Sequence, residues 1–147
     1  METAVTLDRA IQISLTKPLR RRTETVSLDE ARGRVTARSL ASKVDDPRFD
    51  NSAMDGFAVR AEDCEDEKTT LTIVGTSQAG EDSPPEVGQG QACRIMTGAP
   101  MPRGADAIVM IEDTDVQGKT VTLMGPARTG FIRRRAENLS VGQEALP

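Results

Sequence analysis

Histidine, tryptophan and tyrosine are absent from this sequence of 147 residues. Without an imidazole the chain cannot build a Ser-His-Asp or Cys-His catalytic unit, and it has no histidine to ligate zinc or haem. Acid–base chemistry must therefore come from carboxylates, lysine or water. Aromatic residues make up only 2% of the chain, so it also lacks the stacking platforms that bind single-stranded nucleic acid. These absences exclude imidazole-based catalysis and disfavour a nucleic-acid-binding protein.

Cysteine and long apolar runs are scarce as well. Cys64 and Cys93 are too far apart for a Cys-x-x-Cys metal site. The first lies in an acidic segment typical of a loop and the second in an apolar segment typical of a strand, so we expect two reduced, unpaired thiols. No apolar run approaches the ~20 residues of a membrane helix, and the N-terminus lacks the pattern of a signal peptide. We therefore expect a cytoplasmic protein without a membrane partner.

The remaining composition is typical of a folded protein. Charged residues make up 29% of the chain and hydrophobic residues 37%, with a formal net charge of -4, which is too apolar for a disordered chain. Residues 7–15 carry apolar side chains at helical spacing between a potential N-cap, Thr6, and a helix breaker, Pro18. This pattern predicts one amphipathic helix.

Shorter elements follow the helix. Residues 23–26 are β-branched enough to predict a short strand. Residues 27–30 read Ser-Leu-Asp-Glu, a capping box that predicts a short helix ending at Gly33. Residues 35–40 predict either a second strand or an extended linker.

From about residue 45 the chain consists of short apolar runs separated by Gly, Pro, Asp and Asn. This texture predicts a small barrel or sandwich. Gln117-Gly118 is typical of a hairpin turn, and residues 83–85 are typical of an exposed loop. The apolar residues at 141–147 suggest a chain cut from a longer one. The predicted strands are 57–60, 70–75, 91–96, 107–112, 120–124 and 131–134.

Three segments hold the residues that could carry chemistry. The first, residues 47–60, places Asp50, Asn51, Ser52 and Asp55 just before a predicted strand. A loop in that position can present polar groups from a rigid element. The same residue types also make turns, and composition alone favours a hairpin or bulge at Asp-Gly 55–56.

The second and third segments are candidates for anion binding. In residues 94–110 a strand leads into Thr97-Gly98, where a hydroxyl and an open backbone amide could hold an oxygen of an anion; the alternative is a wide connection that needs Gly and Pro for its geometry. Residues 133–138 begin with three arginines. Strand alternation would place Arg133 and Arg135 on one face as a clamp for an oxyanion; the alternative, also for the run at 20–22, is a solvated charged face.

Taken together, these segments resemble a known family. The order and spacing of residues 49–60, 94–100, 104–110 and 133–135 resemble the N-terminal half of the molybdopterin molybdenumtransferase family, which includes bacterial MoeA and the E domain of gephyrin. The resemblance covers essentially the whole chain. It implies a mainly β fold with minor α, in which a β-barrel-like subdomain is inserted into a small elongated α+β subdomain.

The resemblance also implies a domain organisation. We expect residues 1–45 to form the N-terminal helix and the elongated linker subdomain, with 140–147 as its return strand. Residues 46–139 are expected to form the inserted barrel-like subdomain. The pterin-binding α/β domain of the family is absent from these residues.

The function implied by the resemblance is molybdenum insertion. Family members insert molybdate into adenylylated molybdopterin, release AMP and form molybdenum cofactor with the help of Mg²⁺. They work as homodimers whose cleft lies between the β subdomain of one subunit and the α/β domain of the other. The catalytic Asp and Thr of the family fall on Asp55 and Thr97, and substrate-binding positions on Arg133, Gly98 and Asn138, with no metal ligand assigned. Such chemistry rests on positioning and charge stabilisation, which needs no imidazole.

Two positions depart from the usual pattern of the family. Ala136 and Asn138 stand where its members usually carry Gly and Asp. Asn138 keeps the shape of the side chain and loses its charge, so a metal- or proton-binding role is not carried over to it. Ala136 loses the freedom of Gly at positive φ.

We expect this chain to supply the dimer-partner side of the cleft, to bind no cofactor tightly and to be inactive alone. The alternative is a non-catalytic dimerisation or protein-interaction module, because the helix at 7–15 has an apolar face with little to cover. A barrel that binds oligonucleotides is disfavoured by the net charge of -4 and the few aromatics.

Overall fold

The computed structural model describes residues 4–16, 22–64, 68–80 and 83–147. The chain divides into two units, residues 1–38 and residues 39–147. Within the described ranges, no helix is long and apolar enough to cross a lipid bilayer.

The first unit contains α1 (Leu7–Thr16), which confirms the predicted helix. The Arg9 N–H donates to Thr6 Oγ1 at 3.3 Å, as the predicted N-cap requires, whereas the expected end at Pro18 lies outside the described residues. The apolar face of α1 is exposed, with Leu7 76%, Ile11 48% and Leu15 80% accessible to solvent. Within this unit α1 therefore contributes no buried side chain to a core.

The predicted capping box forms only in part, before a single 3-10 turn, η1 (Asp29–Ala31), because the Ser27 hydroxyl donates to Glu30 and caps no backbone N–H. The Glu30 carboxylate accepts from the Ser27 hydroxyl at 2.9 Å and from the Ser27 N–H at 3.2 Å, and these bonds hold the pKa of Glu30 below its ordinary value. The strand predicted at 23–26 is wrong, because a strand needs a hydrogen-bonding partner and the described residues offer none there. Residues 35–39 are an irregular linker.

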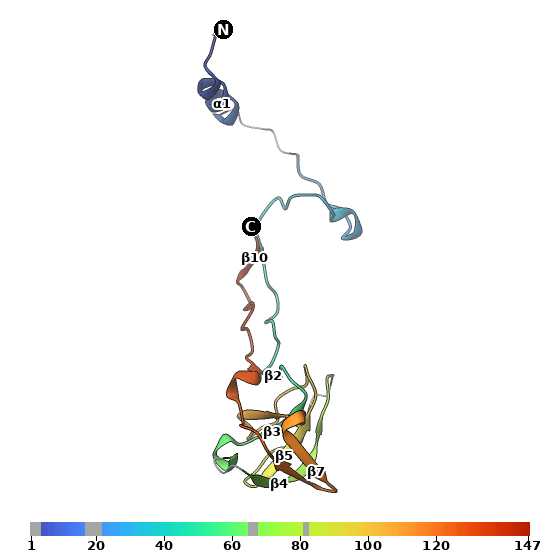
Figure 1. Ribbon diagram of the computed structural model, residues 1–147. Helices are drawn as coiled ribbons and strands as arrows, with labels where there is room; N and C mark the ends of the chain where they lie inside the picture. Colours follow the sequence, from blue (N-terminus) through green and yellow to red (C-terminus); the bar gives the residue numbers. More distant parts are fainter. Residues whose placement is uncertain (1–3, 17–21, 65–67, 81–82) are drawn as a thin grey trace. The chain divides into compact units, whose positions relative to one another are not determined.

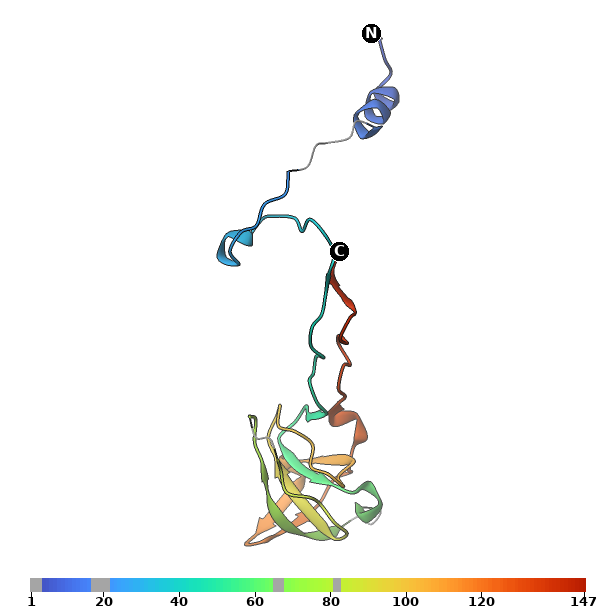
Figure 2. The same ribbon diagram turned by 180° about the vertical axis from the view of Figure 1, so that it is seen from behind.

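A two-stranded ribbon begins the second unit. β1 (Leu40–Ala41) pairs antiparallel with β10 (Glu144–Leu146), which lies within the predicted return strand. The pairing continues along the ribbon to a bridge between Asp46 and Leu139, whose backbone hydrogen bond is 2.8 Å long. In both views the two segments, one blue-green and one red, run side by side (Figures 1 and 2). The domain boundary expected at residues 45–46 stays a prediction.

The main sheet has six strands in the order β6-β3-β5-β4-β8-β7. The β4–β5 pair is parallel and the other pairs are antiparallel. Among the described strands, edge strands β6 and β7 do not pair with each other, so the expected barrel is an open, curled half-barrel (Figure 1). The strands are β3 (Gly56–Val59), β4 (Thr69–Ser77), β5 (Gln91–Ile95), β6 (Ala107–Met110), β7 (Thr114–Gln117) and β8 (Thr120–Leu123).

Strand β3 lies between β5 and β6 and is buried along its whole length. Its side chains alternate between two apolar clusters, as a strand covered on both faces requires. Phe57 and Val59 belong to one cluster with Leu71, and Ala58 belongs to the other with Ile132. The strand that follows the first motif is therefore a fixed support for that motif.

Glycine at position 56 is dictated by the close approach of β6. A Cβ at Gly56 would lie 2.0 Å from the carbonyl oxygen of Val109, which is a severe clash with backbone. The turn predicted for Asp-Gly 55–56 is therefore wrong, because Gly56 is the first residue of a central strand. The hairpin predicted at Gln117-Gly118 is confirmed, with Gly118 at φ 62° between β7 and β8.

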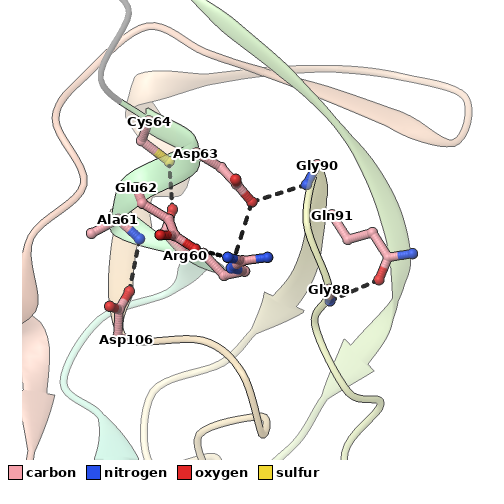
Figure 3. Close-up of polar contacts among 9 residues, drawn as sticks. All are labelled: Arg60, Ala61, Glu62, Asp63, Cys64, Gly88, Gly90, Gln91 and Asp106. Atoms are coloured by element: carbon pink, nitrogen blue, oxygen red, sulfur yellow. Dashed lines mark hydrogen bonds and ion pairs between the residues drawn. The ribbon is translucent and has the colours of Figure 1, made fainter.

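Polar contacts fix the connection after β3, a 3-10 turn named η2 (Ala61–Cys64), against its neighbours (Figure 3). The Ala61 N–H donates to Asp106 Oδ1 at 2.7 Å, and the Gly90 N–H donates to Asp63 Oδ2 at 2.9 Å. Burial and the nearby carboxylates raise the pKa of Cys64 to about 11. Cys64 and Cys93 form no disulfide in the described part of the chain, as predicted.

Candidate functional site

The three motifs meet at β2 (Asn51–Ser52), a two-residue strand that immediately precedes the Met-Asp-Gly segment. On one side, β2 pairs antiparallel with β9 (Ile132–Arg133), where Asn51 is opposite Arg133. On its other side lies the loop at 96–101 that follows β5. Backbone pairing thus joins segments that are far apart in the sequence.

Main-chain hydrogen bonds hold the loop at 96–101 against β2. The Gly98 N–H donates to the Ser52 carbonyl at 2.8 Å, and the Ser52 N–H donates to the Ala99 carbonyl at 3.1 Å. At the end of β4, the Ser77 hydroxyl donates to the Pro100 carbonyl at 2.7 Å. The loop is consequently fixed from two strands, and this fixes the position of Thr97.

Asp55 and Thr97 are in direct contact. Oδ1 of Asp55 accepts two hydrogen bonds from Thr97, one from its N–H at 2.6 Å and one from its hydroxyl at 2.8 Å. These bonds, the backbone one first, and then the charge of Arg94 hold the pKa of Asp55 below its ordinary value. The carboxylate is exposed to solvent and negatively charged at neutral pH, and these contacts favour its charged form further.

The geometry separates the two oxygens of the Asp55 carboxylate. Oδ1 is occupied by Thr97, whereas the described residues donate no hydrogen bond to Oδ2. Both donors of Thr97 are used by Asp55, so its hydroxyl keeps only acceptor capacity for a further partner. An anion cannot be held by these donors in this arrangement, and the pair is suited to water, to a hydroxyl or to a cation.

Gly98 contributes space. It adopts φ 80°, which favours glycine, and no atom lies within 4 Å of the position that a Cβ would take. Its N–H is already bonded to Ser52, so an anion at this amide would have to share that donor. The role predicted for Gly98 stays a prediction.

The three consecutive arginines have different environments. β9 ends at Arg133, and the chain then enters a turn, so the strand alternation that we expected through Arg135 is wrong. The Arg134 guanidinium donates to Asp50 Oδ2 at 2.7 Å, and Nε of Arg135 donates to Asp45 Oδ2 at 2.6 Å. Within the described part of the chain, no carboxylate forms an ion pair with Arg133.

Asn138 lies at the ribbon. Its Nδ2 donates to Asp46 Oδ2 at 3.0 Å, and its N–H donates to the Asp46 carbonyl at 2.9 Å. The structure therefore brings together Asp55, Thr97 and Gly98, links Arg133 to them through β2, and places Asn138 on the side of the Asp46–Leu139 bridge. Ala136 adopts φ 62°, the conformation for which the loss of Gly is unfavourable.

Sequence analysis missed Asp45 and Asp50 as partners of the arginines. Each carboxylate accepts from a backbone N–H and from a guanidinium, and these bonds hold both pKa values below the ordinary value. For Asp45 the Val141 N–H is the larger cause, and for Asp50 the Arg135 N–H. No local pattern in the sequence indicated these pairs, because each joins residues more than 80 positions apart.

A magnesium ion would find few ligands in this chain alone. The described residues contain no group of three or more Asp, Glu, Cys or His side chains that could hold a metal. Mg²⁺ is often bound by one or two carboxylates, with water and substrate phosphates completing its shell. Asp55 Oδ2 fits that mode of binding, in which most ligands come from outside the protein.

Comparisons with known proteins identify the family. The sequence pattern described as "MoeA N-terminal region (domain I and II)" matches residues 5–147. A molybdopterin molybdenumtransferase of Synechococcus elongatus is 42% identical over 130 residues, which are 84% of this chain and 32% of that protein. One of Haemophilus influenzae is 39% identical over 145 residues, which are 97% of this chain and 36% of that protein.

A solved structure agrees with this assignment. The molybdopterin biosynthesis moeA protein from Pyrococcus horikoshii OT3 matches with a TM-score of 0.76 and 35% identity, covering 84% of this chain and 34% of that one. The chain spans about a third of the length of the curated relatives that it matches. On the sequence match, the relatives and the fold, this chain belongs to the family of MoeA N-terminal regions that comprise domains I and II.

Proposed function

We propose that this chain is the part of a molybdopterin molybdenumtransferase that presents Asp55, Thr97 and Arg133 to the substrates. The reaction is the insertion of molybdate into adenylylated molybdopterin, with release of AMP. The observation that carries the proposal is the contact between Asp55 and Thr97, two residues from separate motifs whose loops are both fixed on β2. The names of the relatives, which are molybdopterin molybdenumtransferases, support the activity.

Asp55 is the residue that acts on the reacting groups in this proposal. Thr97 holds Oδ1 with two donors, so the Oδ2 of the charged carboxylate has a defined position and remains open to a further partner. Oδ2 would order a water molecule or hold a magnesium ion. A bound magnesium ion would neutralise charge on the phosphoryl group that leaves with AMP.

Arg133 is the anion-binding residue. Its guanidinium has no ion-pair partner in the described part of the chain, and guanidinium groups bind tetrahedral oxyanions through charge-assisted hydrogen bonds. We assign molybdate or the phosphate of the substrate to Arg133. Gly98 supplies open space beside Thr97. Asn138 is proposed as a substrate-binding residue only because its position matches one in the family.

The length of the chain supports a proposal about its partners. Because the chain spans about a third of its relatives, the other side of the cleft is supplied by protein outside these residues. We propose that this other side is a pterin-binding domain of a second subunit in a homodimer, and that the chain is inactive alone. Cytoplasmic location belongs to the same proposal, and nucleic acid and membrane are not expected partners.

Substitution of Asp55 tests the proposal directly. In an enzyme that carries this chain as its N-terminal region, we expect Asp55→Asn to lower the rate of AMP release at least ~100-fold, because the charge at Oδ2 is removed while the size of the side chain is kept. The assay follows AMP and molybdenum cofactor formed from adenylylated molybdopterin and molybdate.

The matched control is Asp115→Asn on the β7–β8 hairpin, where the carboxylate likewise accepts a side-chain hydrogen bond, from Gln117 at 2.9 Å. This variant is expected to keep the full rate. Normal turnover by the Asp55→Asn enzyme would show that the role assigned to Asp55 is wrong.

A second candidate function is a dimerisation or protein-interaction module. The exposed apolar face of α1, formed by Leu7, Ile11 and Leu15, favours it. Light scattering on this chain over a range of concentrations tests the idea: association should be lost in Ile11→Asp and kept in the control Gln12→Asp. A chain that stays monomeric at every concentration would argue against a self-sufficient interface on α1.

A further inference from the structure

The arginine run at 133–135 carries three positive charges, but its surroundings compensate two of them. Asp45 lies beside the Arg135 guanidinium and Asp50 beside the Arg134 guanidinium, at 2.6 and 2.7 Å. Both carboxylates have pKa values below the ordinary value, so they are charged at neutral pH. Arg133 is the arginine of the run whose charge no described carboxylate compensates.

Asp50 occupies a central place among these contacts. Its Oδ2 accepts from the Arg134 guanidinium, its Oδ1 accepts from the Arg135 N–H at 2.8 Å, and its carbonyl accepts from the Met101 N–H at 2.9 Å. One residue therefore ties the arginine run to the loop that follows Thr97.

The position of Asp50 in the sheet links it to Arg133. Asp50 directly precedes β2, in which Asn51 is the partner of Arg133. The β2–β9 pairing holds the backbone of Arg133, and the two bonds to the Asp50 carboxylate hold the next two residues. The backbone of Arg133 is thereby fixed both at its own position and just after it.

We propose that Asp50 is a positioning residue with two effects. It fixes the backbone of Arg133, and its ion pair with Arg134 keeps that guanidinium from competing with Arg133 for the anion. A tetrahedral oxyanion would then bind to the guanidinium of Arg133 alone. This inference rests on the proposed function, because it takes molybdate as the oxyanion bound at Arg133. Asp50 itself touches no substrate in this scheme.

The experiment is a double-mutant cycle in an enzyme that carries this chain as its N-terminal region. Asp50→Asn removes the charge and frees Arg134. We expect the KM for molybdate to rise about tenfold and kcat to change less than about threefold, because the variant weakens binding of the anion and leaves the chemical step largely unchanged. Asp50→Glu keeps the charge and both acceptor oxygens and should restore most of the affinity.

The cycle is completed in the Arg133→Ala background. If Asp50 acts through Arg133, the Asp50→Asn change should there cause no further rise in KM, and KM stays constant or falls where the freed Arg134 takes the anion, since coupled residues give non-additive effects. An equal rise in KM in both backgrounds, or no rise in either, overturns the role of Asp50. If Arg133→Ala alone leaves KM unchanged, the assignment of the oxyanion to Arg133 falls as well, and the Asp55→Asn assay then stands as the separate test of the proposed function.

Two further variants separate positioning from folding. Asp45→Asn removes the carboxylate beside Arg135 and is expected to leave the KM for molybdate within about twofold, as a matched control. Circular dichroism on each variant shows whether it is folded. Should Asp50→Asn not fold, Arg134→Met breaks the same ion pair from the other side and frees Asp50 to pair with Arg133. Its rise in KM must likewise vanish in the Arg133→Ala background, and a rise that persists there overturns the proposal.

Discussion

Thr97 shows how one residue can set the chemistry of another. Its N–H and its hydroxyl both donate to Oδ1 of Asp55, a residue 42 positions away in the sequence. A hydroxyl that donates to a carboxylate cannot donate to an anion at the same time. Thr97 is therefore better suited to hold Asp55 in one orientation than to bind an anion itself.

The Cβ atom of Ala136 is unfavourable in the backbone conformation that this residue adopts. It adopts φ 62°, and for a residue with a Cβ this left-handed conformation costs roughly 1–2 kcal/mol. We expect Ala136→Gly to raise the free energy of unfolding by about 1 kcal/mol, because the relief of strain exceeds the entropy that glycine adds to the unfolded chain. Urea denaturation followed by circular dichroism measures the change.

Ala79→Gly is the control for Ala136→Gly. Ala79 is exposed, and Ala136 is the residue other than glycine that has a positive φ in the described part of the chain. The control should lower stability or leave it unchanged, because glycine adds unfolded-state entropy without relieving strain. A loss of stability in Ala136→Gly equal to that in Ala79→Gly would contradict the strain argument.

At the scale of elements, regular runs were predictable and short pairings were not. Strands β3, β5 and β6 follow from apolar runs between turn residues, and α1 from helical spacing. β2 is two residues long, which is too short for any periodicity to be seen, and the strand predicted at 131–134 is confirmed only over the two residues of β9. The Asp50–Arg134 ion pair joins residues 84 positions apart, and only the folded sheet brings them together.

The same contrast holds for the candidate site. Asp55 and Thr97 could be named from the Met-Asp-Gly and Met-Thr-Gly segments, whereas their contact depends on the hydrogen bonds that fix the loop at 96–101 on β2. The alternation expected for Arg133 and Arg135 failed because β9 ends at Arg133, two residues before Arg135. After Arg133 the chain forms a local turn, in which the Glu137 N–H donates to the Arg134 carbonyl at 3.1 Å and Ala136 has a positive φ.

The central strand gives a prediction of its own. A Cβ at Gly56 would lie 2.0 Å from the Val109 carbonyl oxygen, which is backbone of β6 and cannot move without disturbing the sheet. We expect Gly56→Ala to lower the free energy of unfolding by roughly 3 kcal/mol or more. Gly130→Ala is the control, since no atom lies within 4 Å of its Cβ position; equal effects of the two variants in urea denaturation would refute the clash.

The junction between the ribbon and the half-barrel predicts a pH dependence. The pKa values of Asp45 and Asp50 are lowered in the folded state, so the stability they provide is present above the unfolded value of about 3.9 and is lost as the pH falls below it. We expect the melting temperature to fall between pH 5 and pH 3, and to fall less in Asp50→Asn. The control Asp115→Asn should follow the wild-type curve, and a wild-type slope in Asp50→Asn would contradict the prediction.

For the whole molecule, the site is an outcome of tertiary structure. Three segments spread over residues 47–138 converge on β2, and the strands that carry them belong to the unit of residues 39–147. The described residues of the first unit contribute no side chain to either hydrophobic cluster. The supports of Asp55, Thr97 and Arg133 therefore lie entirely in the second unit.

This division predicts that residues 39–147 fold without the first unit. Both apolar clusters, and every hydrogen bond named above for Asp50, Asp55 and Thr97, lie within this range. We expect a chain of residues 39–147 to unfold at the same urea concentration as the full chain, within ~0.2 M, because removing a unit that adds no side chain to either cluster changes neither the free energy of unfolding nor the slope. The chain has no tryptophan or tyrosine, so circular dichroism replaces intrinsic fluorescence as the probe.

Amide exchange on the full chain is the second measurement. Residues 7–16 should exchange nearly as fast as an unfolded peptide, because a helix of 10 residues without buried side chains has marginal stability. Protection of these amides comparable to that of β3, or a lower midpoint for residues 39–147, would show that the two units stabilise each other.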